Sequence, residues 1–282
     1  MILVTAATGN VGSHLVSALR SQGEPVRALV RGLQQPLPEG VELAVGDLED
    51  TQSVARAMRD CQGLFLLAGY GDVPGLLSAA AREGVGRIVL LSGGGAVATN
   101  TDNVISQYQL RSERAVSGSG LSWTILRPFA FMSNALRWTE QLRRGDVVTV
   151  PFPNVANATI DPYDIAQVAA VALSAEGHAG QIYRLSGPQA LRPADQVGVL
   201  GGLLGRDLLV DGQSDERART EMEATMPHEY VDAFFSFYVD GSLDESRVLP
   251  TVEQVSGKPP QTFAQWAQRH LDAFGGGQSG SA

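Results

Sequence analysis

The stretch Ile2-Leu3-Val4-Thr5-Ala6-Ala7-Thr8-Gly9-Asn10-Val11-Gly12 decides the fold of this 282-residue chain. Its apolar start, Ile2–Thr5, predicts a buried strand, and apolar residues at helical spacing predict a helix from Val11 to Gln22. Between the two, a short turn directs backbone N–H groups and the helix N-terminus toward an anion. Gly9 lets a pyrophosphate approach the backbone, and Gly12 lets the helix pack closely on the sheet. We therefore predict a dinucleotide-binding turn, with a tight helix–sheet contact as the alternative.

Further along the chain, short apolar runs alternate with amphipathic stretches, as in a parallel sheet with crossover helices. The other predicted strands are 26–30, 42–45, 64–67, 88–91 and 123–126, and the predicted helices between them are 51–58, 74–83 and 104–117. Several of these strands are almost wholly apolar, which indicates that helices cover both faces of the sheet. The sequence thus predicts an α/β protein with a Rossmann-type, doubly wound parallel sheet and a smaller, mostly helical C-terminal substrate lobe.

The regular alternation of strands and helices stops after Pro128, so we predict a second unit there. Residues 1–127 form the predicted dinucleotide-binding core, which 157–185 complete with a helix and a strand. Residues 128–156 and 186–272 form the predicted substrate-binding lobe. The Gly/Ser-rich end of the chain, 273–282, is predicted to be a disordered tail.

Composition excludes several classes of protein. Apolar residues make up 44% and charged residues 18% of the chain, which predicts a compact fold with a sizeable core. No signal peptide and no run long enough to span a membrane is visible, so we expect a cytoplasmic protein. Cys61 is the only cysteine, which excludes an internal disulfide, and the scattered histidines offer no metal site. The net charge of −9 argues against nucleic acid as a partner.

The end of the second predicted strand indicates which nicotinamide cofactor is used. An acidic residue there would bind the ribose 2′-OH of NAD, but the sequence reads Val30-Arg31-Gly32. The guanidinium of Arg31 is suited to a 2′-phosphate, which predicts NADPH (NADP) as the cofactor; a solvated loop arginine is the alternative. Asp47, after the third strand, either accepts a hydrogen bond from adenine or caps the helix that begins near Thr51.

Several stretches together resemble the NmrA-like branch of the atypical short-chain dehydrogenase/reductases, which includes quinone and triphenylmethane-dye reductases, isoflavone-type reductases and catalytically silent NADP sensors. The resemblance rests on 5–12, 30–31, 46–48, 84–92 and 126–128, and it covers 1–185 well and the remainder loosely. It implies that Thr8, Gly9, Asn10 and Val11 hold the pyrophosphate, Arg31 the 2′-phosphate, and Asp47 and Leu48 the adenine. It also implies that Leu67, Ala68 and Gly69 border the ribose, and that Ser92 and Pro128 lie near the nicotinamide.

The proton donor of ordinary short-chain reductases is missing from this sequence. Those enzymes use a tyrosine made acidic by a lysine four positions later, whereas Lys258 is the only lysine here and residue 254 is glutamine. The lysine of isoflavone-type reductases is also absent from the corresponding helix start, 106–109. Tyr108 on that helix remains a catalytic candidate, because a phenol can donate a hydrogen bond to a developing oxyanion; packing is the alternative.

Aromatic residues gather in the predicted second lobe, although the chain is only 6% aromatic. We predict that some of them form a wall that faces a flat apolar substrate, the alternative being an ordinary core. The proposed wall consists of Phe129, Phe131, Met132, Tyr230 and Phe234. His228, beside the last two, is a further group that could reach a substrate.

Two functions from different classes fit these observations. The first is an NADPH-dependent reductase of a small apolar or aromatic compound (a quinone, enone, iminium ion or dye) by direct hydride transfer without a Tyr–Lys pair. The second is a catalytically silent NADP(H)-binding redox sensor that acts through a protein partner. A non-redox isomerase that uses the cofactor structurally is a third option. Turnover of NADPH separates the first two.

Overall fold

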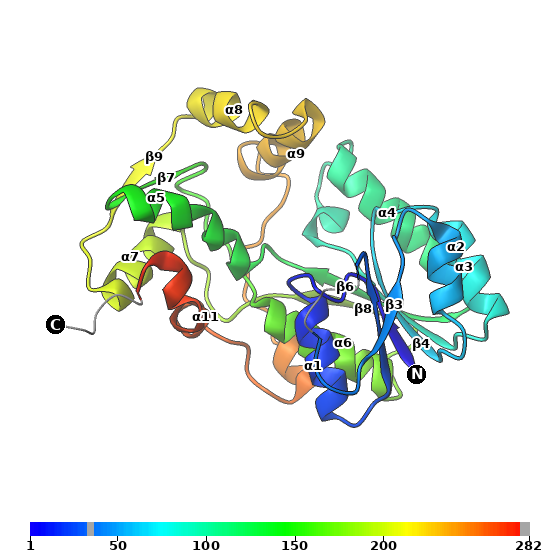
Figure 1. The fold of residues 1–282 in the computed structure, drawn as a ribbon. Coiled ribbons are helices and arrows are strands. Elements are labelled where there is room, and N and C mark those ends of the chain that lie inside the picture. Colours follow the sequence, from blue (N-terminus) through cyan, green and yellow to red (C-terminus); the bar gives the residue numbers. More distant parts are fainter. Residues whose placement is uncertain (33–36, 277–282) are drawn as a thin grey trace.

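A seven-stranded sheet forms the centre of the protein in the computed structural model, which describes residues 1–32 and 37–276 (Figure 1). All of its strands are parallel, and their order is β3-β2-β1-β4-β5-β6-β8. They are β1 (Ile2–Val4), β2 (Val26–Val30), β3 (Glu42–Val45), β4 (Gly63–Leu67), β5 (Arg87–Leu91), β6 (Ser122–Pro128) and β8 (Gln181–Leu185). The strand order reverses direction between β1 and β4, so the predicted doubly wound sheet is confirmed.

Helices cover both faces of this sheet. One face carries α1 (Gly12–Ser21), α6 (Pro162–Ser174) and α10 (Thr251–Ser256), and the other carries α2 (Thr51–Ala57), α3 (Val73–Arg82) and α4 (Val104–Ser117). Side chains alternate along each strand, so Ile2 and Val4 pack on the face covered by α1 and α6, while Leu3 packs on the face covered by α2 and α3. Helix α10 buries Val252 in the apolar core that α1 and α6 form with the sheet. This short helix therefore packs on the sheet, whereas the sequence assigned it, within 186–272, to the second lobe.

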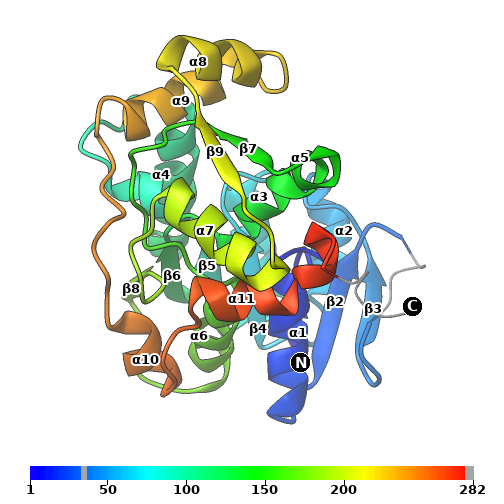
Figure 2. The same cartoon turned by 90° about the vertical axis from the view of Figure 1, so that its left-hand side faces the viewer.

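The second lobe lies to one side of the sheet, beyond the ends of its strands (Figures 1 and 2). A two-stranded parallel pair joins two distant segments of it. The lobe contains η2 (Met132–Trp138), α5 (Thr139–Arg144), β7 (Val147–Val150), α7 (Pro193–Leu204), β9 (Leu209–Gly212), α8 (Asp215–Glu223), α9 (His228–Tyr238), α11 (Phe263–Arg269) and η3 (Leu271–Phe274), while η1 (Gly94–Val97) follows β5.

The chain end departs from the predicted tail of 273–282. Phe274 closes η3 fully buried, with its ring 6.1 Å from that of Trp266, so the apolar core of the lobe holds this residue in place. The predicted boundary was therefore too early. Residues 277–282 lie outside the part of the chain that the structure describes.

The turn after β1 is built around a very close backbone contact. Ala6 has a φ of +48°, a left-handed conformation that costs an alanine free energy. In this conformation its carbonyl oxygen lies where a Cβ on Gly12 would be, only 2.1 Å from that position. A side chain at residue 12 is thus incompatible with the turn, which explains why the first residue of α1 is glycine.

We predict that Gly12→Ala lowers the free energy of unfolding by about 2 to 3 kcal/mol and abolishes NADPH binding, because the added methyl group must displace a backbone carbonyl. Gly202→Ala is the matched control: Gly202 lies exposed in α7 with no atom near its missing Cβ, so its replacement should raise stability by about 0.5 to 1 kcal/mol. Chemical denaturation and titration calorimetry measure both effects. An unimpaired Gly12→Ala variant would contradict the role given to this contact.

Candidate active site

A cavity of about 320 Å³ lies at the C-terminal ends of the first strands, against the turn after β1. Its walls come from the β1–α1 turn, the end of β2, the loop after β3 and the end of β4. Six of the predicted nucleotide-binding residues line it: Thr8, Gly9, Arg31, Asp47, Leu48 and Leu67. The sequence did not single out Tyr70, which also lines this cavity.

The other predicted nucleotide-binding residues lie around this cavity without lining it. Asn10 extends toward the second lobe, where its Nδ2 donates a hydrogen bond to Ser133 Oγ on η2 at 3.2 Å. Val11 is buried at the start of α1, and Ala68 follows β4 directly. Gly69 has a φ of +85°, and the Tyr108 ring lies 2.7 Å from where its Cβ would be, so only glycine fits beside this ring.

Asp47 is free of the capping role that the sequence left open. The residue that caps α2 is Asp50, whose Oδ1 accepts a hydrogen bond from the Gln52 backbone N–H at 3.0 Å. The Asp47 carboxylate instead accepts from the Glu49 backbone N–H at 3.0 Å and faces the cavity. Its position at the cavity wall is compatible with the predicted adenine contact.

Arg31 lies at the exposed end of β2, on the same cavity. It forms no salt bridge with any residue in the described ranges, 1–32 and 37–276. An arginine without a salt bridge keeps its five donors for a ligand, and its fork geometry matches a phosphate. This arrangement supports Arg31 as the group that recognises a 2′-phosphate.

A buried polar network fixes the ends of β5 and β6, where the nicotinamide is expected. Ser92 Oγ donates to Glu113 Oε1 at 2.6 Å, and Arg127 donates to both carboxylate oxygens of Glu113, from Nε at 2.9 Å and from Nη2 at 2.5 Å. Pro128, buried at the end of β6, follows directly. Because the Ser92 proton is committed to Glu113, this hydroxyl can offer a ligand only its acceptor lone pairs.

Tyr108 lies on α4 and is partly buried, and Tyr230 of α9 packs in the same apolar cluster. Burial raises the pKa of Tyr108 above its usual value, and the nearby phenol of Tyr230 adds to the shift. The phenol therefore stays protonated at neutral pH, as a hydrogen-bond donor requires, and it has none of the acidity of a Tyr–Lys pair.

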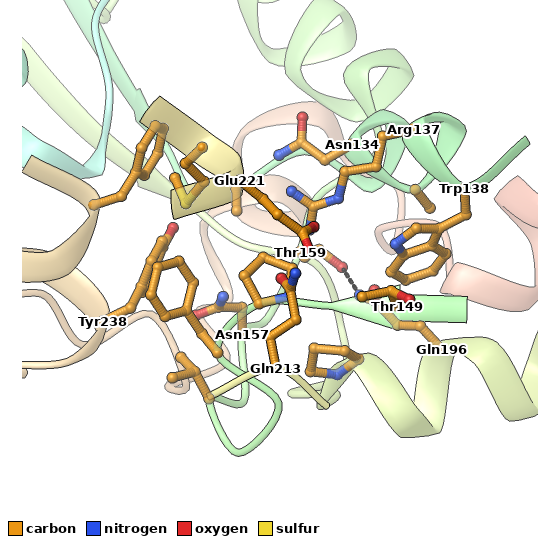
Figure 3. Close-up of a pocket in the computed structure, with 18 of the residues that line it drawn as sticks. Asn134, Arg137, Trp138, Thr149, Asn157, Thr159, Gln196, Gln213, Glu221 and Tyr238 are labelled. Atoms are coloured by element: carbon orange, nitrogen blue, oxygen red, sulfur yellow. Dashed lines mark hydrogen bonds between the residues drawn. The ribbon is translucent and has the colours of Figure 1, made fainter. Parts of the chain in front are cut away.

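A second cavity, of about 680 Å³, lies inside the second lobe (Figure 3). Of the five residues proposed as a substrate wall, Phe131 and Phe234 line it, together with Met222, Met226 and Tyr238. The other three do not line it. Phe129 and Met132 are only 1% and 2% exposed and belong to the protein interior, and Tyr230 packs beside Tyr108.

His228 also lies away from this cavity. Its side chain is 67% exposed at the start of α9, and its two ring nitrogens lie 3.0 Å from Glu223 Oε1 and 3.1 Å from Asp232 Oδ2. The suggestion that His228 reaches a substrate is therefore not supported, because the ring is held on the surface by two carboxylates.

Glu245 is a buried acid that the sequence did not reveal. It lies in the loop after α9 with 4% exposure, and its Oε2 accepts a hydrogen bond from the Ala130 backbone N–H at 3.1 Å. Burial raises the pKa of Glu245 to about 7. A single glutamate in a loop carries no sequence signal, so only the fold shows that it is buried beside the end of β6.

Comparisons with known proteins agree with this geometry. A family model described as NAD(P)H-binding matches residues 6–176. The chain is 35% identical to a (4-alkanoyl-5-oxo-2,5-dihydrofuran-3-yl)methyl phosphate reductase of Streptomyces griseus, over 97% of this chain and 99% of the relative. It is 33% identical to an NAD(P)H azoreductase of Xenophilus azovorans, over 98% and 99% of the two chains.

Among solved structures, an NADPH-dependent quinone oxidoreductase from Escherichia coli has a TM-score of 0.78 at 21% identity, over 96% of this chain and all of that chain, which shows a shared fold. The chain thus belongs to the NAD(P)H-binding family, and the resemblance to NmrA-like atypical short-chain reductases is confirmed. The prediction that the protein is an NAD(P)H-dependent oxidoreductase is confirmed as a class of enzyme. Within the described residues, no helix is both long and apolar enough to cross a membrane.

We predict that the protein binds NADPH about 10- to 100-fold more tightly than NADH, and that Arg31→Ala removes this preference, because a charge-assisted pair contributes about 1.5 to 3 kcal/mol. Arg82→Ala, at the exposed C-terminal end of α3, serves as the control with an equal change in charge. Titration calorimetry with both cofactors measures the difference. Equal affinities in the unmodified protein would rule out the assignment of Arg31.

We predict that Glu245→Gln makes the protein more stable, and increasingly so as the pH rises from about 4.5 to about 7. The folded state raises the pKa of this carboxyl, so ionisation in that range costs folding free energy that the neutral amide avoids. Burial also raises the pKa of Asp164 to about 7, so the stability gained in Asp164→Asn should likewise grow as the pH rises. Denaturation at several pH values tests this; a stability difference that does not change with pH would contradict it.

Proposed function

We propose that this protein is an NADPH-dependent reductase of a flat apolar or aromatic compound, such as a quinone, an enone, an iminium ion or a dye, which it reduces by direct hydride transfer. The observation that carries the proposal is the position of the two cavities. One is bordered by the nucleotide-binding turn, and the other begins at Ala130 and Phe131, directly after β6 ends. The hydrogen bond from Asn10 to Ser133 links the turn beside the first cavity to η2, which contributes residues to the second.

The first cavity has the residues that a nicotinamide dinucleotide requires. The glycine turn presents backbone N–H groups, Arg31 supplies a cation for the 2′-phosphate, and Asp47 and Leu48 border the adenine side. Close contact between Gly12 and Ala6 leaves this wall free of side chains that would exclude a pyrophosphate. When bound, the reduced cofactor supplies a hydride.

The second cavity suits an apolar partner for that hydride. Phe131, Phe234 and Met226 offer a ring-shaped ligand apolar contacts, and the volume is in the range of small-molecule sites. Enclosing substrate and cofactor side by side replaces a bimolecular encounter with an oriented one. The protein's contribution to rate is then mainly orientation and exclusion of water.

Proton delivery does not depend on a Tyr–Lys pair in this proposal. A reduced quinone or azo compound can take its protons from water, and an iminium ion needs none on the atom that loses its charge. Tyr108, protonated and beside Gly69, can donate a hydrogen bond to an oxygen that gains negative charge. The two relatives named above are both reductases, which supports this class of reaction over an isomerase.

We predict that the purified protein oxidises NADPH when given quinones or azo compounds, and that Tyr108→Phe lowers kcat/KM by about 10- to 100-fold with unchanged NADPH affinity, because one hydrogen bond is lost. Absorbance of NADPH measures the rate. Nucleotide binding without turnover across the panel would favour the redox sensor. A loss beyond about a thousandfold in Tyr108→Phe would instead show an essential proton donor.

A further inference from the structure

The larger cavity has two chemically different sides. Figure 3 shows Tyr238 on one side and Arg137 and Trp138 on the other, with Gln213 between them at the cavity floor. The apolar residues of α8 and α9 lie on the Tyr238 side. The opposite side comes from η2 and the residue after β9, where Arg137, Trp138 and Gln213 contribute polar groups beside the apolar Ala135.

Three hydrogen-bond donors on this polar side have no partner in the described part of the chain. Trp138 is 1% exposed and Gln213 is 7% exposed, and neither the indole Nε1–H nor the Gln213 side-chain Nε2 makes a hydrogen bond there. The Arg137 guanidinium makes neither a salt bridge nor a hydrogen bond with any residue of 1–32 or 37–276. Arg137 is exposed, but Trp138 and Gln213 are buried, and buried donors are almost always satisfied, so two unpaired ones in one cavity indicate a missing acceptor.

The positive charge of Arg137 is available to a ligand. The side chain is exposed, desolvation by neighbouring groups lowers its pKa, and the guanidinium still stays protonated at any ordinary pH. Glu221, the acidic residue of the cavity wall, is engaged by Arg217 Nε at 3.0 Å. Arg217 is further paired with Asp211 at 2.7 Å. Both of these acids are therefore paired with Arg217, and neither forms a salt bridge with Arg137.

Two glutamines on the same walls have hydrogen-bond partners, unlike the three donors. Gln141 Oε1 accepts from the Thr149 backbone N–H at 2.7 Å, and Gln196 Nε2 donates to Thr159 Oγ1 at 3.2 Å. In Figure 3 the guanidinium of Arg137 and the amide of Gln213 are both directed toward the middle of the cavity. The open donors thus surround one space.

We propose that Arg137, Gln213 and Trp138 form an oxyanion subsite that holds a phosphate monoester group of the substrate, whose apolar part lies against the α8–α9 side. This proposal deepens the proposed function, because it assigns a substrate class to the same cavity. The guanidinium and the indole come from adjacent residues of η2 and the amide from the residue after β9, and a phosphate monoester has three terminal oxygens to receive them, whereas a carboxylate has two.

Direct binding of phenyl phosphate to the protein saturated with NADP⁺ tests the subsite without any turnover. Phenol is the matched neutral probe, and a phosphate-free buffer keeps the subsite open. Titration calorimetry should show phenyl phosphate binding at least about tenfold more tightly than phenol. Equal affinities for the two probes would overturn the proposal, whether or not the protein oxidises NADPH.

Variants locate the effect within the cavity. Arg137→Met keeps an unbranched stem beside Trp138 and removes the charge, and Gln213→Leu removes the amide; each should lower phenyl phosphate affinity by about tenfold and leave phenol and NADPH binding unchanged. Arg143→Met is the control, since Arg143 on α5 is 65% exposed and paired with Glu140. Loss of affinity in Arg143→Met equal to that in Arg137→Met, or no loss in Arg137→Met, would overturn the assignment.

Discussion

The backbone contact between Ala6 and Gly12 is the constraint on which the rest of this structure depends. It brings the N-terminus of α1 down onto the end of β1, and from there α1 packs beside α6 across one face of the sheet. Thr8 and Gly9 of the same turn line the smaller cavity. The close contact thus both completes the apolar layer under the sheet and positions the turn that is proposed to bind an anion.

Ala6 shows how the protein accommodates this constraint without a glycine at the first turn position. Its φ of +48° is unfavourable for an alanine by about 1 to 2 kcal/mol, and the strain is retained because the buried residues on either side hold the backbone. The structure shows that alanine adopts the conformation that glycine would, so the loss of that glycine does not exclude a dinucleotide turn.

The sheet domain was predictable from sequence because its signals are local. Each strand is a short apolar run, and the residues around Gly9, Arg31 and Asp47 follow strands whose ends must lie at one edge of a parallel sheet. The second lobe was not predictable in this way. β9 is four residues long and pairs with β7, which lies about sixty residues earlier, and nothing in either segment identifies its partner.

Burial of individual side chains in the lobe escaped sequence reasoning for a related reason. Phe129 and Phe131 are two residues apart with the same chemistry, yet the first is buried beneath the guanidinium of Arg184 and the second lines the larger cavity. The isolated pairing of Phe131 with Ile160 sets that difference, and it depends on a segment thirty residues away. Glu245 was likewise unpredictable, since a loop packs it against the Ala130 amide.

The net charge of −9 bears on how such cavities take up anionic ligands. At long range an acidic protein repels a dinucleotide phosphate, and salt screens this repulsion over about 10 Å. At short range, the contact proposed for Arg31 would pair its guanidinium with the same phosphate at a distance where screening is weaker. Binding in this proposal relies on local pairing instead of electrostatic steering, and an arginine that faces a cavity without a salt-bridge partner in the described residues is the feature that makes local pairing possible. Both cavities have one, Arg31 in the first and Arg137 in the second, so the structure gives each an attachment point for an anionic group.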